Sequence, residues 1–438
     1  MSIGWITLAM FGSMFVLLVL GLPLAFVTSL IAVTFTLGLF GPDGLQLVAS
    51  RIFTFMNEYA LVAVPMFILM ASIMERSGVA KALFAAMRVW AGALPGGLAI
   101  QTMIAATLMG AMTGIIGGEI VLLGLIALPQ MLRLGYDRKL AIGTICAGGS
   151  LGTMIPPSIV LVIYGLTVNV SVGDLFTANL VPGLILSATY IAYIFLRCRL
   201  DPSLGPSAPP QERDRPLRER VALLASLALP GLVVALVLGT IYFGIASVTE
   251  AAAMGVVGTM LAAALRRELT WTVVRDSLHQ TMSTCGMLLW LSFGATAMIG
   301  VYNLAGGPAF VREAITGLPL PPVGIILVMM GILLVLGCIM DWVGICLLAM
   351  PIFVPIVTSL GYSPVWFGVL FCLNMQVSYL SPPFGPAAFY LKGVAPPDIT
   401  LGEIFSAVWP FVGLQLVVLA LVVAWPDLAL WLPGLGAP

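Results

Sequence analysis

Residues 148–158 read GGSLGTMIPPS, a stretch with three glycines and two prolines inside a long apolar segment. Proline removes a backbone donor and breaks the interior of a helix, and glycine weakens one. At membrane depth, irregular backbone is tolerated only where it is buried in protein or lines a water-filled cavity. We therefore expect the helix over 138–166 to unwind near its middle and to expose carbonyl oxygens there.

The composition around this stretch is that of a polytopic membrane protein. Of the 438 residues, 61% are hydrophobic and 8% are charged, whereas a soluble domain carries about 25% charged residues. The net charge is zero, so nothing indicates a nucleic-acid partner. The six cysteines form no CxxC pair, which favours small buried side chains over a disulfide or metal framework; they are Cys146, Cys198, Cys285, Cys338, Cys346 and Cys372.

The chain contains an internal duplication. Pro156-Pro157 recurs 226 positions later as Pro382-Pro383, inside the polar stretch NMQVSYLSPPFGP at 374–386. Internal repeats of this kind are typical of secondary transporters. Four more pairs share the offset: Gly135-Tyr136 with Gly361-Tyr362, Leu94-Pro95 with Leu320-Pro321, Pro129 with Pro355, and Tyr164 with Tyr390.

The duplication predicts an all-α inverted-repeat fold of about ten transmembrane helices and two re-entrant helical hairpins. We divide the chain into a first repeat (1–200), a cytoplasmic loop (201–220), a second repeat (221–425) and a C-terminal tail (426–438). We expect full spans near 3–20, 22–40, 58–75, 138–166, 174–196, 221–240, 245–265, 282–302, 364–391 and 403–425. The spans 138–166 and 364–391 are the two predicted broken helices.

The segments 97–132 and 323–360 are the predicted hairpins. Each limb has about 17 residues, or about 25 Å at 1.5 Å per residue, which falls short of the hydrocarbon thickness of about 30 Å. An arrangement of twelve full spans stays open as an alternative. A re-entrant hairpin and a pair of full spans both bring the chain back to the side from which it entered, so the flanking loops keep their sides in either arrangement.

The basic residues set the orientation. With the N-terminus outside, 16 of the 18 lysines and arginines are cytoplasmic, and only Arg51 and Arg312 are not. The two hairpins then enter from opposite sides, so the repeats are inverted. The segments 79–92 and 268–281 mix charges with tryptophan and are interpreted as interfacial helices, with ordinary cytoplasmic loops as the alternative.

Two acidic residues stand at the predicted hairpin tips. Asp341 carries the only charge between 323 and 360, and acids inside a membrane are functional by default. Glu119 opens the second limb of the first hairpin, where it is either part of a site or a partner of the helix dipole. Asp174 and Glu403 match across the repeat but are interpreted as helix caps, and Glu250 as an interfacial residue.

Two stretches resemble a known family. GLIALPQMLRLGYDRKLAIGTICAGGSLGTMIPPSIVLVIYG (124–165) and PIFVPIVTSLGYSPVWFGVLFCLNMQVSYLSPPFG (351–385) are similar to the large membrane subunit of tripartite ATP-independent periplasmic (TRAP) transporters. The resemblance implies a sodium-driven elevator transporter in the bacterial inner membrane. It would receive a small organic acid from a periplasmic binding protein and work with a small four-helix membrane subunit.

The resemblance also implies site residues, in which backbone carbonyls of hairpin tips and broken helices hold sodium. The first sodium site would use Thr113, Gly114, Ile115, Gly152, Ile155 and Pro157, and the second Asp341, Trp342, Val343, Ser378, Ser381 and Pro383. The predicted substrate contacts are Gly118, Glu119, Ser150, Asn374 and Gln376. The first tip departs from the Ser-Gly-Ser-Ser turn common in the family, because it reads Thr-Gly-Ile-Ile.

Other functions stay open or are disfavoured at this stage. Coupling to protons through Glu119 or Asp341 is the main alternative, and an ion channel is a weaker one. We expect no enzyme and no cofactor besides the coupling ion, because the only histidine, His279, lies in a polar stretch and the chain has no HExxH pair. No arginine cluster within the membrane identifies the acid.

Overall fold

The protein is helical throughout the part of the chain that the computed structural model describes, which is residues 2–78, 83, 94–114, 117–207, 228–383 and 385–436. Within these ranges, six helices are long and apolar enough to cross a membrane. The protein is therefore a multi-pass membrane protein. The predicted Ile115 and nearly all of 79–92 lie outside the described residues, as does most of the loop 201–220.

Within the described residues, the first half begins with four α-helices, continues with a helical hairpin and an interrupted helix, and ends with one long helix. Its elements are α1 (Ile3–Val19), α2 (Leu24–Phe40), α3 (Gly44–Met56), η1 (Tyr59–Val62), α4 (Ala63–Arg76), α6 (Gly97–Thr113), α7 (Gly118–Arg133), α8 (Arg138–Ser150), η2 (Leu151–Thr153), α9 (Ile159–Val168) and α10 (Val172–Leu200).

The second half repeats this order after the short helix η3 (Pro202–Leu204). Its elements are α13 (Ala228–Tyr242), α14 (Val248–Leu265), α15 (Trp271–Leu304), α16 (Gly307–Thr316), α17 (Pro322–Gly337), α18 (Trp342–Ser359), α19 (Pro364–Leu380), α20 (Pro386–Lys392), α21 (Leu401–Ala424) and α22 (Asp427–Gly436).

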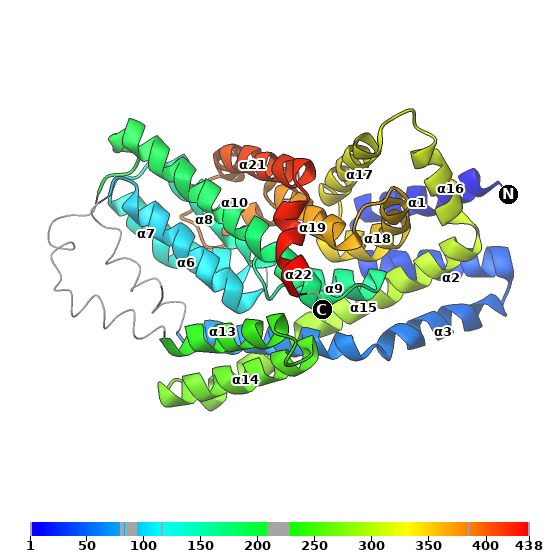
Figure 1. Cartoon of the computed structure of the whole chain (residues 1–438), viewed down its shortest axis with the longest axis horizontal. Helices are drawn as coiled ribbons and strands as arrows, with labels where there is room; N and C mark the ends of the chain where they lie inside the picture. Colours follow the sequence, from blue (N-terminus) through cyan, green and yellow to red (C-terminus); the bar gives the residue numbers. More distant parts are fainter. Residues whose placement is uncertain are drawn as a thin grey trace.

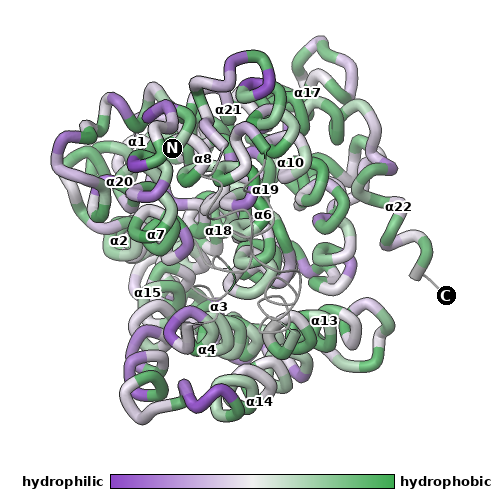
Figure 2. The backbone as a smooth tube through the Cα atoms, turned by 90° about the vertical axis from the view of Figure 1, so that its left-hand side faces the viewer, coloured by the Kyte–Doolittle hydropathy of each residue, from purple (hydrophilic) through white to green (hydrophobic). Residues whose placement is uncertain are grey.

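The helices form two groups. The scaffold consists of α1–α4 and α13–α16, in which α2 packs on α15 and α4 packs on both α14 and α15. The hairpin domain consists of α6–α10 and α17–α22. Figure 1 shows α3, α13, α14 and α15 along one side of the molecule, and the view along the long axis separates α3, α4, α13 and α14 from α8, α10 and α21 in the same way (Figure 2).

The two hairpins lie in opposite halves of the molecule. In Figure 1, α6 and α7 lie in the left half of the molecule, whereas α17 and α18 lie in the right half, where the N-terminus is marked. The limbs contain 17, 16, 16 and 18 residues, or about 24–27 Å of helix. Only α18 among them is long enough to count among the six apolar spans.

Both helices that carry Pro-Pro are interrupted. The first breaks between the end of α8 at Ser150 and the start of α9 at Ile159, and the second between Leu380 and Pro386. Both Pro-Pro peptide bonds are cis. Side chains satisfy part of the freed backbone: Asn179 donates from Nδ2 to the carbonyl of Met154, and the Ser158 hydroxyl donates to the carbonyl of Thr153 at 2.6 Å.

The prediction of a separate interfacial helix at 268–281 is wrong, because residues 271–304 form the single helix α15. The offset of 226 relates the first part of α15 to α3, a helix that the sequence analysis did not predict. The first repeat ends α3 at Asn57, whose side-chain amide bonds the carbonyl of Phe53. Asparagine competes for backbone groups in this way and disfavours helix interiors, whereas Ser283 at the matching position continues the helix. The predicted tail likewise contains the helix α22.

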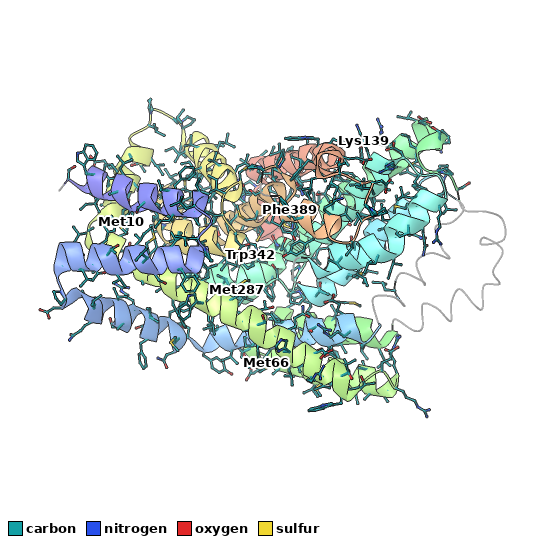
Figure 3. All side chains as sticks on the ribbon, turned by 180° about the vertical axis from the view of Figure 1, so that it is seen from behind. Met10, Met66, Lys139, Met287, Trp342 and Phe389 are labelled. Atoms are coloured by element: carbon teal, nitrogen blue, oxygen red, sulfur yellow. The ribbon has the colours of Figure 1, made fainter. Side chains whose placement is uncertain are left out.

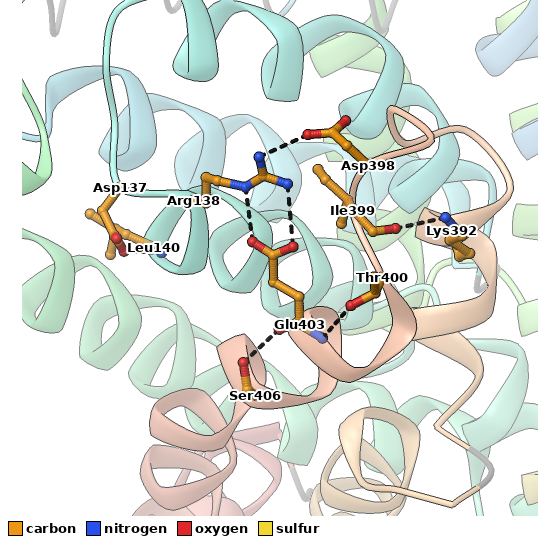
Figure 4. Close-up of polar contacts among 9 residues, drawn as sticks. All are labelled: Asp137, Arg138, Leu140, Lys392, Asp398, Ile399, Thr400, Glu403 and Ser406. Atoms are coloured by element: carbon orange, nitrogen blue, oxygen red, sulfur yellow. Dashed lines mark hydrogen bonds and ion pairs between the residues drawn. The ribbon is translucent and has the colours of Figure 1, made fainter.

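Asp174 and Glu403 lie at the starts of helices, as predicted, but in the first turns, because the caps themselves are Ser171 and Thr400. The backbone N–H groups of Asp174 and Glu403 bond the hydroxyls of Ser171 and Thr400, which cap α10 and α21. Glu403 also makes a contact that the sequence did not indicate: its carboxylate accepts a hydrogen bond from the Arg138 guanidinium at 2.9 Å. Figure 4 shows Arg138 between Glu403 and Asp398, where it ties α8 to the segment before α21. The Arg138 guanidinium lowers the pKa of Asp398 by hydrogen bonding.

Candidate functional site

A cavity of about 440 Å³ lies between the scaffold and the hairpin domain. Its hairpin-domain walls come from both hairpin tips and both broken helices, and its scaffold wall comes from α4 and α15. Trp342 of α18 and Met287 of α15 both line it, and Figure 3 places them near the middle of the molecule. This volume is within the range of small-molecule sites.

The first hairpin tip rests on the break of the first broken helix. Gly114 ends α6 with φ +57°, in the left-handed region. A Cβ at Gly114 would lie 3.2 Å from the carbonyl carbon of Pro157 and closer still to its oxygen. A Cβ at Gly110 would lie 3.0 Å from the Cα of Gly152. Only glycine allows this approach, so the structure brings together Thr113, Gly114, Gly152 and Pro157.

Glu119 lies in the same junction and is almost fully buried, with 2% of its surface exposed. Its Oε1 accepts a hydrogen bond from the Thr113 hydroxyl. A Cβ at Gly152 would lie 2.8 Å from that oxygen. The other oxygen, Oε2, has no hydrogen-bond partner in the described residues. A buried carboxylate that has no basic partner costs several kcal/mol, so this position favours a positively charged occupant beside it or a proton on it.

The second hairpin tip has an equivalent arrangement around Asp341. Asp341 caps α18, and its carboxylate accepts from the backbone of Val343 at 3.1 Å. The end of α17 touches the second broken helix, since a Cβ at Gly337 would overlap the side chain of Ser378. A small cavity of about 20 Å³ lies between Asp341 and Ser378. A space of 10–15 Å³ is enough for one water molecule, so this gap is the size of a single small occupant.

Ser381, Pro383 and Ile155 lie next to these junctions but line neither cavity. The Ser381 hydroxyl donates to the carbonyl of Val377 at 2.7 Å, within its own helix. Ile155 is buried. These residues can contribute backbone oxygens to a site without exposing a side chain to it.

Among the residues predicted to bind substrate, Asn374 and Gln376 make hydrogen bonds between helices, and the Ser150 hydroxyl bonds within its own helix. Gln376 is fully buried and donates from Nε2 to the carbonyl of Ser150 at 2.6 Å and to the Thr153 hydroxyl. Asn374 donates to the carbonyl of Met330 at 2.8 Å. The Ser150 hydroxyl donates to the carbonyl of Ala147. None of Ser150, Asn374 and Gln376 lines the main cavity, whereas Gly118 and Glu119 do.

The scaffold wall was missed by sequence reasoning. Glu75 of α4 and Gln280 and Thr284 of α15 line the cavity opposite the hairpin tips. Gln280 is held by Arg76, whose Nη2 donates to its Oε1 at 2.6 Å. In the sequence, Glu75 directly precedes Arg76 and is indistinguishable from a charge at the end of a span. Only its tertiary position marks it as part of a site.

The cavity carries an excess of negative groups. Glu75, Glu119 and Asp341 line it, and no lysine or arginine does among the residues that the structure describes. The described residues also contain no group of three or more His, Cys, Asp or Glu side chains that could hold a metal ion. Carboxylate, hydroxyl and carbonyl oxygens are ligands for hard cations, so these groups are able to hold a hard cation, and the carboxylates are able to carry a proton.

Comparison with known proteins gives one family. The family model for the tripartite ATP-independent periplasmic transporter, DctM component, matches residues 11–428. The chain is 32% identical to the C4-dicarboxylate TRAP transporter large permease protein DctM of Pseudomonas aeruginosa, covering 91% of this chain and 92% of that protein. It is 29% identical to the isethionate TRAP transporter permease protein DctMQ of Oleidesulfovibrio alaskensis, covering 97% of this chain and 66% of that protein.

The fold also matches a solved structure. The crystal structure of the Alcanivorax borkumensis YdaH transporter superposes with a TM-score of 0.67, covering 97% of this chain and 99% of that chain. The sequence identity is 15%, so this likeness concerns the fold alone. The family model and the similarity to a DctM permease decide the identification: this chain belongs to the family of large permease subunits of tripartite ATP-independent periplasmic transporters.

Proposed function

We propose that this permease imports a small organic acid by sodium symport across the bacterial inner membrane. It would receive the acid from a periplasmic binding protein and work beside a small four-helix membrane subunit. Two relatives are named for transport of C4-dicarboxylates and of isethionate, and all of these compounds are anions. The observation that carries the coupling is the cavity lined by three carboxylates and, within the described residues, by no basic side chain.

The electrostatic argument follows from that lining. An anionic substrate that enters beside Glu75, Glu119 and Asp341 meets three acidic side chains and, among the described residues, no basic one; two like unit charges 4 Å apart repel by about 4 kcal/mol at an effective dielectric constant of 20. Cations bound at the two junctions reverse this repulsion. The acid then binds only together with its coupling ions, which is the requirement for symport.

In this proposal the first sodium is held by Thr113, Gly114 and Ile115 of the tip with Gly152, Ile155 and Pro157 of the broken helix. The second is held by Asp341, Trp342 and Val343 with Ser378, Ser381 and Pro383. Backbone carbonyls supply most ligands, as they do where transporter helices unwind. The cavity of about 20 Å³ between Asp341 and Ser378 supports the second site.

The acid would lie between the two tips, near Gly118 and Glu119. The amino ends of α7 and α18 point their helix dipoles towards this space, which favours a carboxylate. Asn374 and Gln376 would act as positioning residues, because they donate to the carbonyls of Met330 and Ser150 and so hold the broken helices in place. The hairpin domain would slide as a unit along α4 and α15 and carry substrate and ions together.

The test is uptake by the complete complex in proteoliposomes, with its own binding protein and labelled succinate, isethionate and other small organic acids. An inward sodium gradient should drive uptake of at least one acid, and an equal potassium gradient should not. Uptake driven by a pH gradient without sodium would support the second candidate, proton coupling, which the unpartnered Oε2 of Glu119 favours. Currents that persist without the binding protein would indicate a channel.

A further inference from the structure

Glu75 lies against the amino end of α7, and the proposed function gives it no role beyond its negative charge in the cavity. It belongs to the last turn of α4, in the scaffold, and is half-buried. A Cβ at Gly118 would lie 2.9 and 3.1 Å from its two carboxylate oxygens. Gly118 is the first residue of α7. The absence of a side chain at 118 therefore lets a scaffold carboxylate approach the start of a hairpin helix.

This end of α7 is suited to an anion. Its N-cap is Gly117, and no side chain caps it by a hydrogen bond. The unsatisfied N–H groups and the dipole of the first turn attract negative charge. Gly117, Gly118 and the buried, unpartnered Oε2 of Glu119 all belong to this junction, which lines the main cavity. The junction thus offers a place for an anion beside a place for a cation.

The described residues give Glu75 no hydrogen-bonded ion pair. The neighbouring Arg76 directs its guanidinium elsewhere, since Nη2 donates to Gln280 and Nε donates to Ser72 at 3.4 Å. The Glu75 carboxylate is half-buried and is attracted by Arg76 only over a longer distance, so the amino end of a helix can stabilise it further. Its position beside Gly118 fits the attraction that a substrate carboxylate would also feel there.

The contact depends on where the hairpin domain stands. The cavity is lined by the last turns of α4 and by the part of α15 from Gln280 to Leu288. The distribution of basic residues places both segments near the cytoplasm. The start of α4 at Ala63 is about 18 Å further along the helix from Glu75. In the proposed sliding movement, a hairpin domain that moved towards the outside would leave Glu75 behind, so the contact with α7 would belong to the cytoplasm-facing conformation.

We propose that Glu75 promotes release of the substrate by competing with the substrate carboxylate for the amino end of α7 in the cytoplasm-facing conformation. This inference rests on the proposed function. It makes the affinity for the acid lower on the cytoplasmic side than on the outside, without any change in the sodium ligands. The occupant of the α7 end alternates between the acid during transport and Glu75 after release.

The test compares Glu75→Gln with the wild type in oriented proteoliposomes that contain the complete complex, its binding protein and an inward sodium gradient. The measurement is the internal concentration of the transported acid, succinate or isethionate, that halves net uptake. The amide keeps the shape and removes the charge, so this concentration should fall about tenfold, the size of one partly screened charge repulsion. The half-saturating external concentration should stay within twofold.

Two further variants guard the interpretation. Glu75→Ala removes the same charge with a different shape and should shift internal inhibition in the same direction. Glu58→Gln removes an exposed acid that lies before α4 and does not line the main cavity, so it should leave internal inhibition unchanged. If both Glu75 variants lower the internal concentration that halves net uptake and Glu58→Gln does not, the result supports competition by the Glu75 carboxylate.

Several results would overturn the inference. If internal inhibition were unchanged in both Glu75 variants, Glu75 would not compete with the substrate. If the half-saturating sodium concentration rose in the variants, Glu75 would be a cation ligand and not a competitor of the substrate. Failure of the proposed function is recognisable separately, because wild-type vesicles would then show no sodium-driven uptake of any acid tested. Active wild-type vesicles with unaltered variants would refute the role of Glu75 alone.

Discussion

Replacing Gly114 by alanine tests the contact between the first hairpin tip and the first broken helix. The added Cβ would lie within 3.0 Å of the Pro157 carbonyl oxygen, on a rigid backbone group. Carbon contacts are comfortable at about 3.5 Å, so the tip must withdraw by roughly 1 Å or more. Binding constellations tolerate displacements of about 0.5 Å, and this shift exceeds that tolerance.

A second cost comes from the backbone. Gly114 has φ +57°, and a residue with a Cβ in the left-handed region costs roughly 1–2 kcal/mol. If the tip keeps its fold, a loss of that size alone corresponds to about a 5- to 30-fold weaker first sodium site. We expect the half-saturating sodium concentration for uptake to rise at least tenfold.

The matched control is Gly361→Ala. Gly361 also has a left-handed backbone, with φ +85°, but a Cβ there meets nothing within 4 Å. It should lower the melting temperature through the same backbone cost and leave the sodium dependence unchanged. Wild-type sodium dependence in Gly114→Ala, measured by uptake at graded sodium concentrations, would refute the reasoning about the tip.

Three further predictions concern the second tip, the bridge between broken helices and the cytoplasmic ion pair. Asp341→Asn should raise the half-saturating sodium concentration at least tenfold in the uptake assay, because it removes the charge beside the small cavity; an unchanged value would remove Asp341 from the site. Gln376→Leu should destabilise the complex by about 1–3 kcal/mol in a melting experiment, because the buried carbonyl of Ser150 loses its donor; an unchanged melting temperature would contradict this. Hydrogen bonding to Arg138 lowers the pKa of Asp398, so this pair stabilises the fold above about pH 3.9, the ordinary pKa of aspartate, and the stabilisation is lost as the pH falls through the lowered value. Melting curves between pH 5 and 3 should therefore converge for wild type and Asp398→Asn at the acid end, and parallel curves would refute the linkage.

Much of the fold could be predicted because the decisive signals are local. Proline and glycine act on the backbone where they stand, so 148–158 and 374–386 indicated two breaks within apolar helices. The predicted hairpin tips at Thr113-Gly114 and at Asp341 also follow from short-range preferences, and the structure places both at helix ends. The internal duplication was recognisable from the sequence alone, because uncommon residue types recur at matching positions 226 residues apart.

The remaining features depend on packing across the chain. Asn374 and Gln376 are polar residues in a broken helix, and the sequence alone did not distinguish contact with a substrate from contact with the carbonyls of Met330 and Ser150. Glu75 gains its place in the site from a glycine 43 positions later. The continuity of α15 escaped prediction because its polar first turns resemble an interfacial helix.

The central claim is that sodium and an anionic substrate bind together where hairpin tips meet broken helices. The most direct test is the melting temperature of the purified membrane complex in sodium chloride and in potassium chloride, with and without the transported acid. We predict that sodium alone raises it, that the acid raises it further only in sodium, and that Gly114→Ala reduces the sodium effect. Equal melting temperatures in the two salts, or stabilisation by the acid in potassium as strong as in sodium, would contradict the account.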